Sequence, residues 1–411
     1  MICIRALVGL CILQVAVSGQ SVSKSSETLT GLFLKATSGE NFNYVSAPFA
    51  GSAILALAAE GAEAGTKSQL IDVLGGELPD KNSYKEMFTS IKGYPSDGNW
   101  KNKVVLKNFL YVYKNYSVLE SFAELARENY LTEVKSVTRP NLEIPGTAED
   151  TSASDTAFKE HAMLIFNGFS LEMSWPTSTW HRTSLSWNGN VVRAFGAAGN
   201  FAIGQIPLLD STVFQLPYKN TDYALLVILP KSKESYSFDE IIEKLQKDGI
   251  KELTKNLVMK PAFVTMPCFH SSNITSMKTV LQETAQVKDI FSDSAADLSK
   301  LSSDNLYLDD VVQQAGVRVC IDGATSYSLT STYNAPSRGR ALKRLSSAKR
   351  VSGSAFTAQR VIKESVVVDR PFMYALYNVA NGVVFVAGKL DRPVWEETDD
   401  AVDSDIETIK L

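Results

Sequence analysis

The sequence predicts an α+β fold in a single large domain. Apolar residues recur at helical spacing in the first third of the chain, and segments rich in strand-forming residues dominate the rest. The connections between these later strands are irregular, which argues against repeated strand-helix-strand units. Neither an internal repeat nor a break in composition divides the 411 residues. With 45% hydrophobic and 21% charged residues, the chain has the composition of a globular protein with a sizeable core.

The expected elements follow from these periodicities. Apolar residues at helical spacing predict helices over Glu27 to Ala36 and Gly51 to Glu60. A strand from Phe109 to Tyr113 precedes a further helix from Leu119 to Tyr130. The glycine-rich stretch Gly196 to Gly204 opens no helix and lacks a dinucleotide fingerprint, so we expect a surface turn there. The other strands are expected over residues 162–171, 213–216, 223–229, 263–269, 317–321, 366–368, 373–376 and 383–386.

The N-terminal 19 residues have the pattern of a secretory signal peptide. Arg5 precedes an apolar run from Ala6 to Val17, and small residues follow it before Gln20. The run is too short to span a bilayer, and no later stretch is a candidate membrane anchor. We therefore expect a secreted, extracellular protein, in which the sequons at Asn115 and Asn273 are candidate glycosylation sites of a glycoprotein.

Charge is unevenly distributed along the chain. The formal net charge is -4, so no overall basic field suggests a nucleic-acid partner. The segment 394–411 is acidic, and we expect it to be a solvated extension. Its acidic residues are Glu396, Glu397, Asp399, Asp400, Asp403, Asp405 and Glu407.

The stretch between Gly323 and Pro371 begins with small residues at alternate positions and then becomes basic. Positions 324, 326, 328, 330 and 332 are all Ala, Ser or Thr, and alternate residues of a strand share one face. Such a strand can enter the middle of a sheet without overpacking the core beneath it. Composition alone favours a solvated basic linker instead. The basic residues are Arg338, Arg340, Lys343, Arg344, Lys349, Arg350 and Arg360.

The residues that common enzyme chemistries require are not arranged in recognisable motifs. The three histidines, His161, His181 and His270, have no metal-ligand spacing. The sequence contains no nucleophile elbow, phosphate loop or dinucleotide fingerprint. We therefore predict a protein that is not an enzyme and that uses no cofactor and no metal.

Several motifs in a fixed order resemble the serpin family, over residues 24–393. The resemblance implies helices and three mainly antiparallel β-sheets, with an exposed reactive loop at about 323–365. It also implies a mechanism: a protease cleaves the loop, and the freed loop inserts into the large sheet and carries the acyl-linked protease with it. The motifs are Asn43, Ala47-Pro48, Gly61 to Thr66, Gln69-Leu70, Asn167 with Trp175, Leu216 to Lys219, Leu225 to Pro230, Pro267 to Phe269, Asp289 to Phe291, Ala296 to Ser299, Leu306 to Leu308, Arg370 to Phe372 and Phe385 to Gly388.

The resemblance assigns candidate roles to individual residues and also reveals departures. Ala47 and Ala50 stand where family members usually carry serines that hold the main sheet shut, and Gln313 stands where a histidine is common. Strand period places the bulky Tyr327 and Leu329 on the outward face of an inserted loop. Sheet gating falls on Ala47, Ala50, Asn167, Trp175 and Gln313, and the hinge falls on Gly323, Ala324, Ser326, Ser328 and Thr330.

The loop is about twenty residues longer than the resemblance implies, so two counts give two reactive bonds. Counting from Gly323 places the bond near Ser337, beside Arg338 and Arg340, whereas counting back from Pro371 places it at Arg360. The bond near Ser337 suits inhibition better. A protease attached at Arg360 would be held by a tether of over thirty residues, so strand insertion need not pull it against the protein. Basic residues at each candidate imply a trypsin-like target protease.

Cys268 and Cys320 fall on strands that the resemblance makes neighbours, so a disulfide and two buried thiols both remain open. We predict a monomeric, secreted inhibitor of serine endopeptidases that acts as a suicide substrate. The alternative is a non-inhibitory serpin that serves as a binding, carrier or structural protein. A third hypothesis makes the basic loop a docking site for an anionic polysaccharide or for the chain's own acidic tail.

Overall fold

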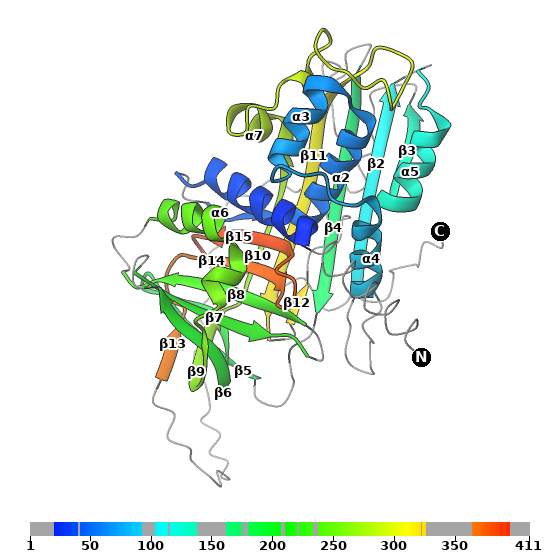
Figure 1. Ribbon diagram of the computed structural model, residues 1–411. Helices are drawn as coiled ribbons and strands as arrows, with labels where there is room; N and C mark the ends of the chain where they lie inside the picture. The colour runs from blue at the N-terminus through cyan, green and yellow to red at the C-terminus, as the bar shows by residue number, and fades with distance from the viewer. Residues whose placement is uncertain are drawn as a thin grey trace, which may run out of the picture.

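The described helices pack against two β-sheets, and one of these helices contacts both sheets (Figure 1). Besides a helix described from residue 20 to residue 36, they are α2 (Pro48–Gly61), α3 (Ala64–Val73), α4 (Lys81–Lys92), α5 (Glu120–Tyr130), α6 (Asp239–Thr254), α7 (Met277–Glu283) and the short 3-10 helix η2 (Asp289–Phe291). The computed structural model describes residues 20–39, 42–92, 103–113, 116–137, 162–173, 175, 180–206, 210–219, 222–232, 237–321, 323–325 and 364–394.

Within the described residues, one sheet has six strands. It carries the start of the reactive-loop segment. Its order is β10 (Phe269–Ser276), β11 (Tyr307–Cys320), β12 (Gly323–Thr325), β4 (Ala162–Met173), β2 (Lys103–Tyr113) and β3 (Thr132–Val137). Most pairs are antiparallel, but β11 with β4 and β2 with β3 are parallel. The sheet is therefore mixed.

The second sheet has nine strands. Its order is β1 (Tyr44–Ser46), β15 (Val384–Leu390), β14 (Phe372–Asn378), β8 (Tyr223–Pro230), β7 (Ser211–Pro217), β6 (Asn190–Ile206), β9 (Val258–Pro267) and β13 (Glu364–Val367), and β5 (Trp180–Trp187) pairs with β6. Three sheets were expected; the described strands are hydrogen-bonded into two, so the expected number is matched only loosely. The reason is the length of β6, whose 17 residues pair with β5 and β9 along one part and with β7 along the other.

The glycine-rich stretch 196–204 is not a surface turn, because β6 runs through it. A Cβ added at Gly196 would lie 3.2 Å from the carbonyl oxygen of Val264, and one at Gly204 would lie 2.8 Å from the Leu257 side chain. These glycines therefore allow close approach inside a sheet. The strand expected over residues 263–269 is also corrected, because the chain leaves β9 at Cys268 and begins β10.

Helix α2 and a group of aromatic side chains join the two sheets. Every residue of α2 except Glu60 is buried, as expected of a helix that is apolar all round. The Phe385 ring, on β15, lies 4.7 Å from the Phe49 ring of α2 and 6.2 Å from the Phe169 ring of β4. The core thus runs continuously from one sheet to the other.

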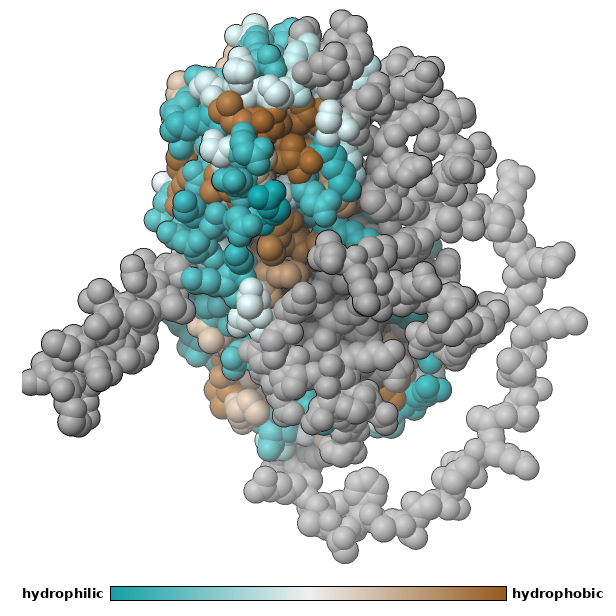
Figure 2. Space-filling view, turned by 90° about the vertical axis from the view of Figure 1, so that its right-hand side faces the viewer, coloured by the Kyte–Doolittle hydropathy of each residue, from teal (hydrophilic) through white to brown (hydrophobic). Residues whose placement is uncertain are grey.

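The described surface is mixed in polarity. On the face that carries β3 and α5, hydrophobic residues lie between hydrophilic ones (Figure 2). None of the helices in the described ranges is long and apolar enough to cross a membrane.

Candidate functional site

The predicted hinge begins inside the six-stranded sheet. Strand β12 lies between the C-terminal ends of β11 and β4 and is antiparallel to both (Figure 1). Position 324 is opposite Val319 and Met173, and position 325 is opposite Arg318 and Glu172. Farther along, β11 and β4 pair directly with each other, from Tyr307 with Ala162 to Ala315 with Phe169. The sheet is thus open at one end and closed over the rest of its length.

The far end of the loop segment lies in the other sheet. Strand β13 runs parallel to β9 at the edge of the nine-stranded sheet, with Glu364 opposite Ala262. The segment between β12 and β13 therefore connects the two sheets. The hinge residues Ser326, Ser328 and Thr330 and the reactive-bond candidates Arg338, Arg340 and Arg360 lie outside the described residues, as do residues 1–19 and 395–411.

A row of buried amides holds the closed part of the sheet together. Gln313 of β11 and Asn167 of β4 are register partners, and Gln313 Nε2 donates to Asn167 Oδ1 at 2.8 Å. Asn167 Nδ2 donates in turn to Asn108 Oδ1 of β2 at 2.7 Å. Asn108 also donates to the carbonyl oxygen of Tyr130, at 3.3 Å. We call Gln313, Asn167 and Asn108 the amide row; each of them is at most 2% exposed.

The amide row also explains how the chain tolerates alanine at position 47. The Gln313 side chain accepts the N–H of Ala47 at 2.8 Å and donates to its carbonyl oxygen at 3.1 Å. One side-chain amide thus satisfies both polar groups of a buried peptide residue. Ala50 is fully buried in α2 and adds only packing. Of the predicted gating residues, Ala47, Asn167 and Gln313 come together in one network.

A role for Asn108 was not predicted from the sequence, although the sequence contains a signal for one. Asn108 interrupts the apolar strand Val104 to Val112 on the face that should point inward. A buried side-chain amide needs partners, because leaving it without one costs about 1–3 kcal/mol. A polar residue within an apolar strand was therefore a pointer to a network across the sheet.

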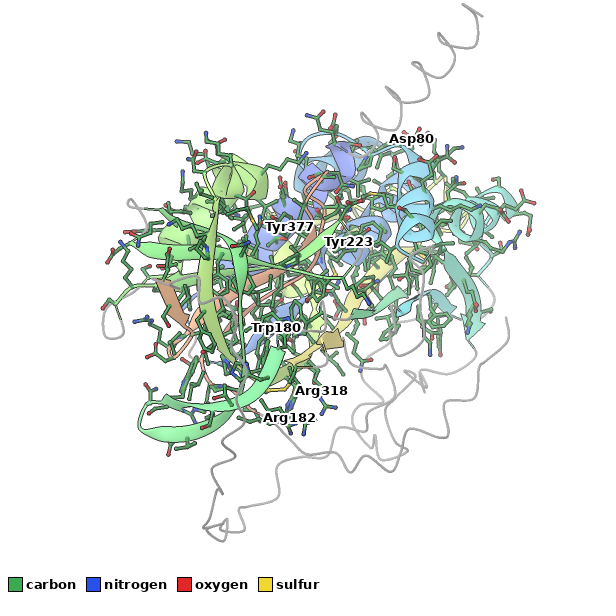
Figure 3. All side chains as sticks on the ribbon, turned by 90° about the horizontal axis from the view of Figure 1, so that it is seen from below. Asp80, Trp180, Arg182, Tyr223, Arg318 and Tyr377 are labelled. Carbon is green, nitrogen blue, oxygen red and sulfur yellow. A yellow bond between two sulfur atoms is a disulfide. The ribbon has the colours of Figure 1, made fainter. Side chains whose placement is uncertain are left out.

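Trp175 lies at the open end of the sheet and connects it to the nine-stranded sheet. Its indole Nε1 donates to the carbonyl oxygen of Cys320 at 2.8 Å, and its ring stacks on Tyr218 with 4.4 Å between centroids. The ring of Trp180 packs against the rings of Trp175 and Phe195, with 5.5 Å and 5.2 Å between centroids (Figure 3). Burial raises the pKa of Tyr218 well above its ordinary value, so the stacked phenol stays neutral.

A disulfide bond joins Cys268 and Cys320, which resolves the two alternatives left open by the sequence. The Cα atoms are 4.5 Å apart. Since Phe269 pairs with Val319, the two cysteines form the next cross-strand pair of β10 and β11. The bridge ends β11 three residues before Gly323 and does not cross the space between β11 and β4. It therefore braces one side of the opening.

The sequon residue Asn273 lies on β10 and is half-buried. Its Oδ1 accepts the N–H of Val45 at 3.0 Å, and its Nδ2 donates to Thr275 Oγ1 at 2.6 Å. The amide thus links β10 to β1. Asn115, the other sequon residue, lies outside the described residues, and glycosylation of both stays a prediction.

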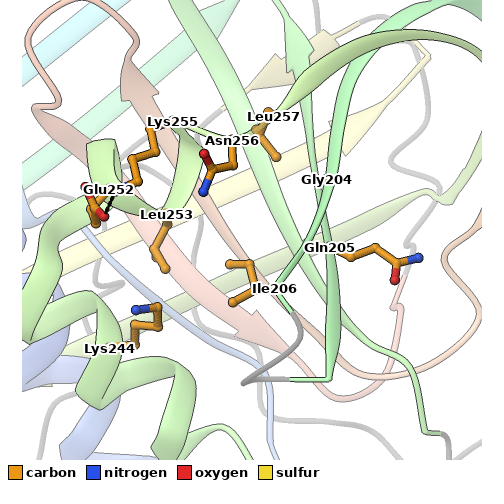
Figure 4. Close-up of a pocket in the computed structure, with 9 residues that line it drawn as sticks. All are labelled: Gly204, Gln205, Ile206, Lys244, Glu252, Leu253, Lys255, Asn256 and Leu257. Atoms are coloured by element: carbon orange, nitrogen blue, oxygen red, sulfur yellow. Dashed lines mark hydrogen bonds and ion pairs between the residues drawn. The ribbon is translucent and has the colours of Figure 1, made fainter.

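A separate pocket of about 240 Å³ lies between the end of α6 and the end of β6 (Figure 4). Lys244 and Lys255 line it, but each makes an ion pair with a nearby acid, Asp248 and Glu252 respectively. Its volume is below the roughly 300–1,000 Å³ of pockets that enclose drug-sized ligands. We therefore place the functional site at the open end of the six-stranded sheet.

Comparisons with known proteins agree with this geometry. A family model described as "Serpin (serine protease inhibitor)" matches residues 25–144 and 192–393. An uncharacterized serpin-like protein of Thermococcus kodakarensis is 23% identical, over 87% of this chain and 83% of its own. Human leukocyte elastase inhibitor is 21% identical, over 85% of this chain and 93% of its own.

Solved structures share the fold. Human thyroxine-binding globulin, in a thyroxine complex, has a TM-score of 0.71 and 17% identity, and the likeness covers 92% of this chain and 100% of that one. Mouse protein-Z dependent protease inhibitor has a TM-score of 0.70 and 17% identity, over 92% of this chain and 99% of its own, so a protein described as an inhibitor and a thyroxine-binding globulin both share this fold. With the family model matching most of its length, the chain belongs to the serpin family.

Proposed function

We propose that the protein is a secreted inhibitor of trypsin-like serine proteases that acts as a suicide substrate by inserting its reactive loop. The observation that carries the proposal is the position of β12, which already lies between β11 and β4. The signal-peptide pattern of residues 1–19 supports secretion.

The register of β12 defines how the rest of the loop would insert. Cross-strand partners share a face of the sheet, and Val319 is buried whereas Arg318 is half-buried. Position 324 therefore shares the inward face with Val319. Continuing the ladder places Ser326, Ser328 and Thr330 on that inward face, opposite Val317, Ala315 and Gln313. The small residues thus meet the core, as strand insertion requires.

The same register accommodates the two bulky residues of the hinge. Tyr327 falls opposite Gly316 of β11, and Leu329 falls opposite Gly168 of β4, both on the outward face. A glycine beside a large side chain leaves room that a larger neighbour would fill. Tyr327 and Leu329 are therefore compatible with insertion.

Insertion must separate Gln313 from Asn167. Thr330 would arrive at the level of these two residues, and its hydroxyl can donate to one amide and accept from the other. The network would then exchange partners instead of losing them. The lost hydrogen bond is worth only about 0.5–1.5 kcal/mol, whereas a new strand adds a ladder of such bonds.

The length of β11 favours the first reactive-bond count. Tyr307, where β11 begins, lies eleven residues before Arg318, and the residue eleven after Thr325 is Pro336. A strand from Gly323 to Pro336 would therefore fill the whole length of β11. Proline lacks an N–H donor and suits the end of a strand. Arg338 and Arg340 follow directly, so full insertion would carry a protease attached there to the far end of the sheet.

The chemistry is that of an interrupted serine-protease reaction. The protease serine attacks the carbonyl of the reactive arginine, the peptide C–N bond breaks, and the amine leaves with a proton. The chain remains joined to the protease through an acyl ester. Inhibition results if insertion distorts the protease before water hydrolyses that ester.

Mixing the purified protein with trypsin tests the proposal. We expect a complex that survives SDS and a released peptide that begins after Arg338 or Arg340. Clean cleavage without a complex would instead support the alternative of a binding, carrier or structural serpin. A stable complex formed at Arg360 would overturn the length argument.

A matched pair of variants tests the register. Ser328→Arg places a charge on the inward face, so we expect it to turn the inhibitor into a substrate that trypsin cleaves without a complex. Tyr327→Arg places the same charge on the outward face and should leave complex formation intact. Equal loss in both variants would refute the register.

A further inference from the structure

The C-terminal end of the described chain follows a defined path. The backbone N–H groups of Asp391 and Arg392 both donate to Asn43 Oδ1, at 2.9 Å, and Asn43 Nδ2 donates to the carbonyl oxygen of Arg392 at 2.6 Å. Two residues farther on, the carbonyl oxygen of Val394 accepts the N–H of His270 at 2.9 Å. The end of the chain is therefore held at two successive points.

These two points give the chain a direction. Val45, two residues after Asn43, donates its N–H to the Asn273 side chain, whereas Val394 is bonded to His270. The chain thus runs along β10 from the level of Asn273 toward the beginning of the strand at Phe269. An extended chain spans at most about 3.3–3.6 Å per residue, so the chain beyond Val394 can reach the level of Cys268 within two residues.

Two arginines, Arg318 and Arg193, lie next to that end of β10, and a third, Arg182, lies near Arg193. His270 is the register partner of Arg318 on β11. The backbone N–H of Cys268 donates to the carbonyl oxygen of Arg193 at 2.8 Å. Arg193 is opposite Ser184 on β5, and Arg182 follows on the same face of that hairpin. Figure 3 shows Arg182 and Arg318 at the same end of the molecule.

The segment that leaves Val394 has the opposite charge. It carries seven carboxylates between Glu396 and Glu407, and its one basic residue is Lys410. Opposite charges within a few ångströms attract, and several pairs that act together form a network stronger than isolated surface pairs. The direction of the chain at Val394, its reach and its charge therefore favour contact between the tail and the arginines.

We propose that the acidic tail, residues 396–407, docks on its own chain against the surface formed by Arg182, Arg193 and Arg318. The docked tail lies beside the start of the loop segment, because Arg318 is also the partner of Thr325 in β12. The alternative is that the tail binds to the basic part of the loop, around Lys343 and Lys349.

Carbodiimide cross-linking of the full-length protein distinguishes these two positions. The reagent joins a carboxylate to a nearby amine, so R318K keeps the positive charge and supplies a reactive group. In low salt we expect a cross-link between position 318 and a peptide from residues 396–407, identified by mass spectrometry. The cross-link should be lost in about 1 M salt, where the screening length falls to about 3 Å.

The matched control is R127K on α5, an exposed position beside Glu128 and far from β10 (Figure 1). We expect no cross-link between position 127 and the tail. Coupling of the tail to Lys343 or Lys349 with none at position 318 would overturn the proposal, as would a cross-link at position 318 that persists unchanged in high salt. The assay requires no protease, so its result is independent of whether the protein inhibits.

Discussion

The two sheets of this protein hold their central strands together in different ways. In the nine-stranded sheet, every residue of β8, β14 and β15 is buried, and their side chains are mostly aliphatic or aromatic. In the six-stranded sheet, the central strands β11, β4 and β2 are joined on their buried face by the amide row of Gln313, Asn167 and Asn108.

The difference bears on which sheet would open in the proposed mechanism. Apolar contacts are lost when strands separate, and burial of apolar surface contributes roughly 25 cal/mol per Å². A hydrogen bond between side chains can be replaced by one to an incoming hydroxyl with little change in free energy. In the proposed mechanism the nine-stranded sheet would therefore serve as a frame, and the six-stranded sheet would admit the strand.

The largest expected effect comes from damage to the frame. Phe385→Ala removes a fully buried ring that contacts Phe49, Phe169 and Tyr223, so we expect a loss of about 3–5 kcal/mol in the free energy of unfolding. Urea unfolding measures it. Val379→Ala, at a residue 45% exposed in the turn between β14 and β15, is the control and should change stability by less than about 0.5 kcal/mol.

A smaller effect concerns the half-buried carboxyl group of Glu27, which lies against α6. Burial raises the pKa of Glu27 from 4.5 to about 7, although the N–H of Ile250 donates to its Oε1 at 3.0 Å and Lys251 is close. Gly249, with a φ of 77°, leaves room for the carboxylate, because a Cβ there would lie 2.8 Å from Oε2. The folded state thus holds its proton at pH values where the unfolded state has lost it.

This difference sets the sign of the pH dependence. The contribution of Glu27 to stability is fully present below pH 4.5 and is lost as the pH rises to about 7, by up to about 3 kcal/mol. Glu27→Gln keeps an acceptor for Ile250 and cannot ionise, so it should stabilise the protein at pH 8 much more than at pH 5. Thermal unfolding at both values measures this, with the exposed Glu243→Gln as control. Parallel changes at the two pH values would contradict the assignment.

A substitution in the amide row is expected to have the smallest effect on stability. It should have the largest effect on opening of the six-stranded sheet. Gln313→Ala leaves Asn167 and the Ala47 peptide groups without this partner, at a cost of about 1–3 kcal/mol. It should also speed the uptake of a synthetic peptide with the sequence of residues 326–336, followed on native gels. Gln314→Ala, on the opposite face of β11, is the control. Slower uptake in the Gln313 variant would show that the row does not restrain the sheet.

Much of the fold is local in origin and was predictable. The helices near Glu27, Gly51 and Leu119 and most of the later strands follow from periodicity, because each buries one face or is wholly buried. Strand β11 was predicted only over its last part. Asp309, Asp310, Gln313 and Gln314 obscure its apolar pattern, and their partners lie on other elements.

By itself, the sequence determined the family, the small residues at alternate hinge positions and the separation of basic loop from acidic tail, since these depend on the order of residues. Only the tertiary structure decided that the described strands join into two hydrogen-bonded sheets, that Cys268 and Cys320 are bonded, and that Gln313 serves Ala47 and Asn167 together. Each of these depends on residues far apart in the chain that meet in one register. A change of one position in that register would exchange the faces of a strand without altering a single residue.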